Sequence, residues 1–114
     1  MRKPLEVAVI GAGLMGHGIA QVFAAAGYAT TLHDPNATVL RAAPEHIARN
    51  LDLMRIESGP VLARIQLCGD LPDAVAKADL VLEAAPERID LKQQLFCDIA
   101  KAAPSSAILA SNTS

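Results

Sequence analysis

The chain has 114 residues, of which 52% are hydrophobic and 3% aromatic, and its formal net charge is −2 at pH 7. This length suits one domain, and no apolar run approaches the ~20 residues of a membrane span, so we expect no membrane partner. The nearly balanced charge, without a basic stripe or interleaved aromatic residues, argues against nucleic acid as a partner.

The first thirty or so residues have the pattern of a strand–helix–strand unit. An apolar run, continuous except for Glu6, predicts a buried strand over 5–10, and 28–34 is rich in residues that favour strands. Between them, 14–26 has helical periodicity, and Gly27 stands where a helix would end. One face of this helix is predicted to be apolar and buried: Met15, Ile19, Val22, Phe23 and Ala26.

The rest of the chain continues the alternation of helices and strands. A less regular helical segment covers 36–57, in which Pro44 is expected to start or kink a helix rather than lie in its middle, and Gly59-Pro60 is expected to break the chain. Asp70 is a candidate cap for a short helix. Three further strands are predicted over 64–68, 79–85 and 107–111, with a helix after Pro86. This order predicts an α/β protein with a Rossmann-type, doubly wound parallel sheet.

The turn after the first strand has the spacing G-x-G-x-x-G: Gly11, Ala12, Gly13, Leu14, Met15 and Gly16. Gly11 permits the tight turn, Gly13 allows a pyrophosphate to approach the backbone, and Gly16 allows the helix to pack on the strand. The N–H groups at the helix start can then hold phosphates without a basic side chain. Asp34, eighteen positions beyond Gly16, can accept hydrogen bonds from ribose hydroxyls and would repel a 2′-phosphate, which favours NAD over NADP.

Other interpretations of this turn stay open. It could be a tight turn without a ligand, or the acid after the second strand could belong to a methyltransferase that binds S-adenosylmethionine. No histidine has a neighbour that marks it as a base: His17 and His33 are expected to be incidental, and His46 to lie at the surface. We expect no metal site. The apolar run near the start of the chain is too short for a signal peptide, so we expect a cytoplasmic protein. In that compartment, Cys68 and Cys97 are expected to be reduced and buried.

Three stretches together resemble a known family. They are "VAVIGAGLMGHGIAQVFAAAGY", "DLVLEAAPE" and "AILASNTS", and they resemble the N-terminal domain of the L-3-hydroxyacyl-CoA dehydrogenases over 5–35 and 79–114. The resemblance implies oxidation of an L-3-hydroxyacyl-CoA to a 3-oxoacyl-CoA with hydride transfer to NAD, in fatty-acid or related acyl-CoA metabolism. It also implies an acyl-CoA substrate and a homodimeric full-length enzyme.

Matched by motif position, the family assigns roles to several residues. Gly11 to Gly16 and Asp34 would hold the ADP half of NAD, and Glu87 and Lys92 would contact the cofactor. Ser114 would lie near the nicotinamide and donate to the 3-oxygen of the substrate, while Asn112 would shape that loop. Each has a plainer alternative, because an acid such as Glu87 is favoured at a helix start and Lys92 could be a solvated charge.

The family pattern also indicates what the chain would lack. In the family, a catalytic histidine, its orienting glutamate and a helical dimerisation domain follow the NAD-binding domain, so 1–114 is expected to be an incomplete Rossmann domain that binds NAD weakly without turnover. The last strand would then be an exposed edge that favours association. Between 36 and 78 the family carries a helical hairpin whose serine and lysine help bind coenzyme A; here Asn50 and Glu57 stand near those places. Two alternatives remain: a dehydrogenase of a small free hydroxy acid, and a non-catalytic nucleotide-binding module.

Overall fold

A computed structural model describes residues 5–84 and 89–111, without the side chains of 89–91. Strands and helices alternate along this part of the chain, as the sequence pattern predicts, except that two helices follow each other between the second and third strands. They are β1 (Glu6–Ile10), α1 (Leu14–Ala25), β2 (Ala29–His33), α2 (Ala37–Leu53), α3 (Ser58–Leu62), β3 (Ile65–Cys68), α4 (Leu71–Val75), β4 (Leu80–Glu83), α5 (Ile89–Ala102) and β5 (Ile108–Ser111).

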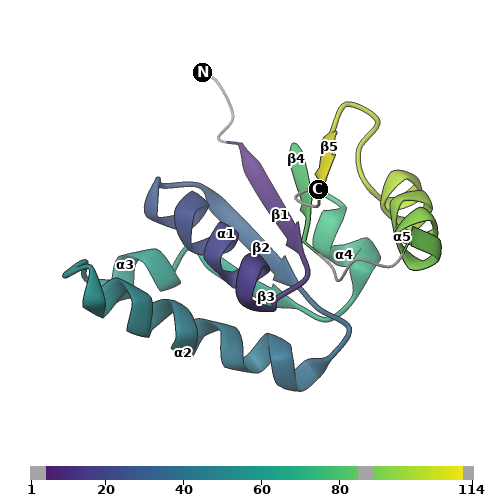
Figure 1. Ribbon diagram of the computed structural model, residues 1–114. Coiled ribbons are helices and arrows are strands. Elements are labelled where there is room, and N and C mark those ends of the chain that lie inside the picture. Colours follow the sequence, from purple (N-terminus) through teal and green to yellow (C-terminus); the bar gives the residue numbers. More distant parts are fainter. Residues whose placement is uncertain (1–4, 85–88, 112–114) are drawn as a thin grey trace.

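The strands form one five-stranded parallel sheet in the order β3-β2-β1-β4-β5. Figure 1 shows α1, α2 and α3 on one face of the sheet and α4 and α5 on the other. Alternate residues of β1 serve the two faces: Val7 and Val9 pack with the first group of helices, and Ala8 and Ile10 with the second. The doubly wound α/β architecture is therefore confirmed.

The direction of winding reverses at β1. From β1 the chain moves outward through β2 to β3, and then returns to place β4 on the other side of β1. In open parallel sheets, such a reversal leaves a crevice at the carboxyl ends of the two central strands, where ligands bind. The glycine turn follows β1 directly, so it lies at this crevice.

Helix α1 packs on the sheet through its smallest residues. Gly16, Ala20 and Ala24 are buried at a spacing of four, whereas Met15 is 57% and Val22 is 65% exposed. Of the predicted apolar face, Ile19 and Phe23 do pack against the core, but Met15, Val22 and Ala26 are exposed, so the prediction is only partly right. The helix follows a tight turn and lies close to the strands, and only glycine and alanine leave room for that approach.

Two expectations about proline and glycine are also wrong. Pro44 lies inside α2, and Gly59 and Pro60 lie within α3 instead of breaking the chain. Tertiary packing outweighs the cost of the proline, because Leu40, Ala43, Ile47 and Leu51 of α2 are all buried. The cap at Asn36 adds to this: its side-chain oxygen accepts from the N–H groups of Thr38 (3.0 Å) and Val39 (3.1 Å).

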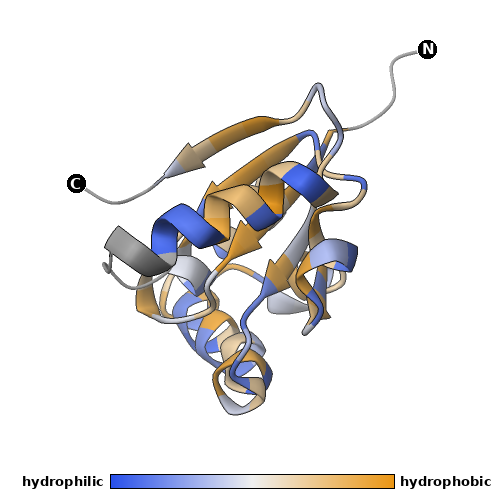
Figure 2. Ribbon diagram, turned by 90° about the vertical axis from the view of Figure 1, so that its right-hand side faces the viewer, coloured by the Kyte–Doolittle hydropathy of each residue, from blue (hydrophilic) through white to orange (hydrophobic). Residues whose placement is uncertain are grey.

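Figure 2 shows the hydropathy pattern of these layers, with mostly apolar strands and helices that carry both polar and apolar residues. Asp70 caps α4 as predicted, accepting from the N–H of Asp73 at 3.0 Å. Both cysteines are free, but Cys97 is exposed and Cys68 is half-buried, so the expectation that both are buried is wrong. None of the helices in the described part of the chain combines the length and apolarity needed to cross a membrane.

Candidate cofactor-binding site

The glycine turn has the geometry that the fingerprint predicts. Gly11 has φ 108°, a conformation that side chains disfavour, and its N–H donates to the carbonyl of His33 at 2.7 Å. A methyl group built on Gly16 would overlap the carbonyl oxygen of Gly11 and lie 2.5 Å from its carbonyl carbon. These two glycines therefore allow α1 to begin directly against the end of β1.

Gly13 has a different role in the same turn. It is the N-cap residue of α1 in an extended conformation, it is exposed, and a Cβ added there would meet no atom within 4 Å. Within the described part of the chain, no neighbouring atom therefore excludes a side chain at this position. A helix N-terminus with free N–H groups and an unobstructed approach is suited to binding phosphate.

Asp34 joins the glycine turn to the end of β2. One of its carboxylate oxygens accepts from the N–H of Ala12 at 2.9 Å, and the other accepts from the N–H of Asn36 at 2.8 Å. These bonds fix the carboxylate beside the turn. Each oxygen has a further lone pair, so the half-buried carboxylate can still accept from a pair of ribose hydroxyls.

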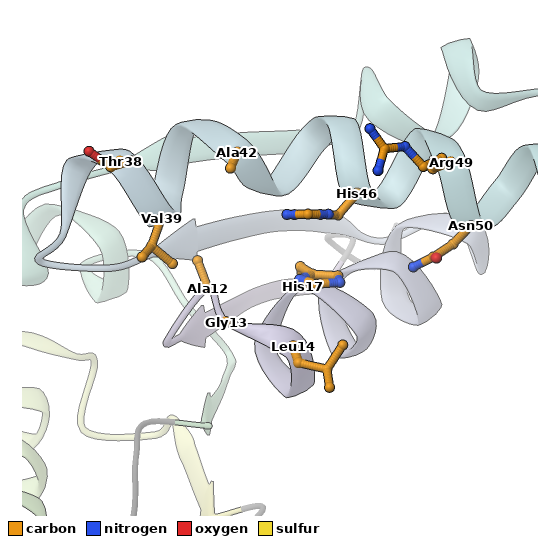
Figure 3. Close-up of a pocket in the computed structure, with 10 residues that line it drawn as sticks. All are labelled: Ala12, Gly13, Leu14, His17, Thr38, Val39, Ala42, His46, Arg49 and Asn50. Atoms are coloured by element: carbon orange, nitrogen blue, oxygen red, sulfur yellow. The ribbon is translucent and has the colours of Figure 1, made fainter.

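Beside the turn, a cavity of about 560 Å³ lies between α1 and α2 (Figure 3). His17 and His46 both line it and stack on each other, with ring centroids 5.1 Å apart and planes 15° from parallel. Asn50 also lines the cavity, and its amide donates to the side-chain oxygen of Gln21 at 3.1 Å. By contrast, Glu57 is exposed at the start of α3, so Asn50 but not Glu57 reaches this cavity.

The environment of His17 was not foreseen from the sequence. The residue is only 7% exposed, and its Nδ1 has no hydrogen-bond partner among the described residues. Burial lowers the pKa of His17, and the neighbouring His46 lowers it further, while the carbonyl groups of Ala12 and Gly13 act in the opposite direction. His46 is exposed, as predicted, but the pairing of two histidines 29 positions apart gives no local signal. His33 is buried on β2, with Nδ1 2.9 Å from the carbonyl oxygen of Cys68.

At the carboxyl ends of β4 and β5, a buried acid was also missed. Glu83, the last residue of β4, is fully buried and accepts from the Ser111 hydroxyl at 2.8 Å. The Lys92 amine lies 3.6 Å from the same carboxylate oxygen, and the Lys92 side chain is 14% exposed. Lys92 is therefore not a solvated helix charge. The sequence pattern predicts Glu83 only as one residue of the strand over 79–85, without a functional role.

Three of the predicted site residues, Glu87, Asn112 and Ser114, lie outside the described residues. The described part of the chain therefore brings together the glycine turn and Asp34, and places Lys92 in a separate cluster with Glu83. A parallel doubly wound sheet, a glycine turn at its switch point and an acid at the end of β2 define a dinucleotide-binding domain.

Comparison with known proteins agrees with this class. The sequence model of the family described as "3-hydroxyacyl-CoA dehydrogenase, NAD binding domain" matches residues 6–114, and the chain belongs to that family. NAD is the cofactor of this domain. A probable 3-hydroxyacyl-CoA dehydrogenase of Caenorhabditis elegans is 37% identical over 100% of this chain and 42% of its own length.

Further comparisons extend the range of relatives. The crystal structure of 3-hydroxybutyryl-CoA dehydrogenase from Escherichia coli K12 has a TM-score of 0.90 and 38% identity, covering 99% of this chain and 25% of that one. L-Carnitine dehydrogenase of Streptomyces coelicolor is 36% identical over 96% of this chain and 35% of its own length. The chain thus spans less than half the length of these relatives.

Proposed function

We propose that this domain serves an enzyme that oxidises an L-3-hydroxyacyl-CoA to the 3-oxoacyl-CoA, with hydride transfer to NAD. The observation that carries the cofactor half is the hydrogen bond that holds the Asp34 carboxylate against the glycine turn, accepted from the N–H of Ala12 at 2.9 Å. Fixed there, the carboxylate is preorganised to receive a ribose while the adjoining helix start receives the diphosphate.

Within this proposal, each residue has a defined task. The N–H groups from Gly13 to Gly16 hold the phosphates, and Asp34 selects a 2′-hydroxyl over a 2′-phosphate. When bound, NAD supplies the hydride acceptor. Ser114, through its position in the "SNTS" motif, donates a hydrogen bond to the 3-oxygen of the substrate, where negative charge develops as the hydroxyl proton is lost. Lys92, Glu87 and Asn112 support the nicotinamide end.

The acyl-CoA half of the proposal is supported by the cavity between α1 and α2. It adjoins the glycine turn through Ala12 and Gly13, and it contains Asn50, which stands near the family position that contacts coenzyme A. The acidic Glu57 stands near the position of the family's lysine, so this chain would bind the carrier with fewer charged contacts there. We also propose that the edge strand β5, where Ile108 is 65% exposed, favours self-association. The complete protein is proposed to be a dimer. It is further proposed to act in the cytoplasm, in fatty-acid or related acyl-CoA metabolism.

A second candidate function has a specific observation in its favour. The L-carnitine dehydrogenase relative has a name that denotes a small free hydroxy acid as its substrate, and it is similar over 96% of this chain. Under this alternative, the cofactor half of the site is unchanged and the cavity between α1 and α2 binds no thioester.

A thermal-shift series tests both halves. A ligand at 100 times its Kd stabilises the folded state by about 2.7 kcal/mol, so NADH is expected to raise the melting temperature by several degrees and NADPH by much less. With NADH present, acetoacetyl-CoA is expected to raise the melting temperature further, whereas acetoacetate and L-carnitine are expected to leave it unchanged. A shift with the free acids alone would favour the second candidate, and a shift with S-adenosylmethionine instead of NADH would refute the cofactor half.

A further inference from the structure

Three polar side chains from three elements meet at the carboxyl edge of the sheet, apart from the glycine turn. Glu83 ends β4, Ser111 ends β5, and Lys92 lies on α5. The Glu83 carboxylate is fully buried, accepts from the Ser111 hydroxyl at 2.8 Å, and lies 3.6 Å from the Lys92 amine. Glu83 and Ser111 are also register partners in the β4–β5 ladder.

Such a cluster is an expensive way to stabilise a fold. Removing a carboxylate and an ammonium group from water costs several kcal/mol for each ion, and a buried ion pair often contributes no more than an apolar pair of the same volume. The cost is offset only where the geometry is good and additional hydrogen bonds are present. A buried glutamate in an otherwise apolar strand therefore points to a role in fixing its partners.

The position of the cluster indicates what it fixes. Glu83 lies just before residues 85–88, Ser111 lies just before 112–114, and Lys92 is near the start of α5. These two segments contain Glu87, Asn112 and Ser114, the residues proposed to serve the nicotinamide end. The backbone around Glu83 is tied to the central strand, because the N–H of Ala84 donates to the carbonyl of Ile10 at 2.8 Å.

We propose that Glu83 is a positioning residue for the nicotinamide ring in the cofactor site, acting through Ser111 and Lys92. It holds the Lys92 amine and the end of β5 in the arrangement that the nicotinamide end requires, and it has no role at the adenosine end, where Asp34 and the glycine turn bind. This inference rests on the proposed function.

Binding of the nicotinamide ring can be probed separately from binding of the rest of the cofactor. ADP-ribose contains the adenosine, both phosphates and the second ribose of NADH but lacks the nicotinamide ring. Glu83→Gln keeps the shape and an oxygen that can accept from Ser111, but it removes the charge beside Lys92. We expect Glu83→Gln to raise the Kd for NADH about tenfold, the size of one lost charge-assisted contact, and to leave the Kd for ADP-ribose within about twofold.

A matched control is Glu45→Gln, which also breaks an ion pair: Glu45 lies 2.9 Å from Arg49, with both side chains mostly exposed. It is expected to change neither Kd. Ser111→Ala tests the same link from the other side and keeps the test available if Glu83→Gln fails to fold, because Ser111 lies on the edge strand. Ser111→Ala should weaken the binding of NADH but not that of ADP-ribose. Ser111→Thr, which keeps the hydroxyl, should bind NADH as the wild-type chain does.

The outcomes separate the two proposals. If the wild-type chain binds neither NADH nor ADP-ribose, the proposed function fails. If it binds both, but Glu83→Gln and Ser111→Ala weaken the two ligands equally or weaken neither, the positioning role of Glu83 is overturned while the proposed function stands. Circular dichroism of each folded variant accompanies the titrations.

Discussion

Substituting alanine for Gly16 tests the packing that brings α1 against the glycine turn. A Cβ at this position would overlap the carbonyl oxygen of Gly11, so either the start of α1 or the end of β1 must move. The obstacle is backbone and not the end of a flexible side chain. Movement of α1 would also disturb the packing of Ala20 and Ala24, both fully buried.

The magnitude follows from two opposing effects. Overpacking that displaces well-packed backbone costs about 3 kcal/mol or more, whereas replacing glycine by alanine inside a helix gains about 0.5–1 kcal/mol. Gly16→Ala should therefore lower the free energy of unfolding by at least about 2 kcal/mol. For a domain of this size, that loss lowers the melting temperature by roughly 8 °C.

Gly18 in the same helix provides the control, because a Cβ there would meet no atom within 4 Å. Gly18→Ala should raise the free energy of unfolding by about 0.5–1 kcal/mol. Urea unfolding followed by circular dichroism measures both variants. Equal stability of Gly16→Ala and Gly18→Ala would refute the argument that close approach of helix and turn demands a glycine at Gly16.

Three other substitutions test separate parts of the account. Asp34→Asn should weaken NADH binding about tenfold and reduce the preference for NADH over NADPH. Fluorescence titration with each cofactor measures both Kd values. An unchanged ratio of the two would contradict the role of the Asp34 charge. His17, whose pKa is lowered in the folded state, resists a proton that the unfolded chain accepts near pH 6.5, so stability should fall as pH drops through that value. His17→Gln should flatten this decline in urea titrations from pH 7.5 to pH 5, and an identical slope would exclude His17 as its source. Pro44→Ala should raise the free energy of unfolding by about 2 kcal/mol. Proline in a helix interior costs about 3 kcal/mol, and this exceeds the stability that proline gives by restricting the unfolded chain. An unchanged free energy of unfolding would mean that α2 already relaxes around the proline.

The features that could be predicted from sequence are those encoded over short distances. The first strand, the glycine turn and the following helix and strand lie within about thirty residues, and each glycine has a local steric reason. The roles of Gly11 and Gly16 in the turn could therefore be predicted before any coordinates. The placement of Asp34 beside that turn followed from the parallel pairing of β1 with β2.

The features that were missed depend on contacts between distant segments. Periodicity marked the larger side chains of α1 as its apolar face, but only Ile19 and Phe23 pack against the core, and the residues that lie closest to the sheet are Gly16, Ala20 and Ala24. The stacking of His17 on His46 depends on how α1 and α2 cross. Likewise, Glu83 lies in an apolar run, and its partners are 9 and 28 positions away, so only the pairing of β4 with β5 and the position of α5 bring them together.

The central claim is that a diphosphate binds against the bare main chain at the start of α1. Gly13 tests it most directly, because a methyl group there meets no protein atom but projects from the exposed main chain of the turn where the phosphates are proposed to bind. Calorimetric titration of NADH into the wild-type chain and into Gly13→Ala is expected to show binding to the first and a loss of affinity of at least tenfold in the second. The variant should lose only about 1 kcal/mol of unfolding free energy, because alanine is a poorer N-cap than glycine, and it should stay folded. Equal affinity of the two proteins for NADH would contradict the claim.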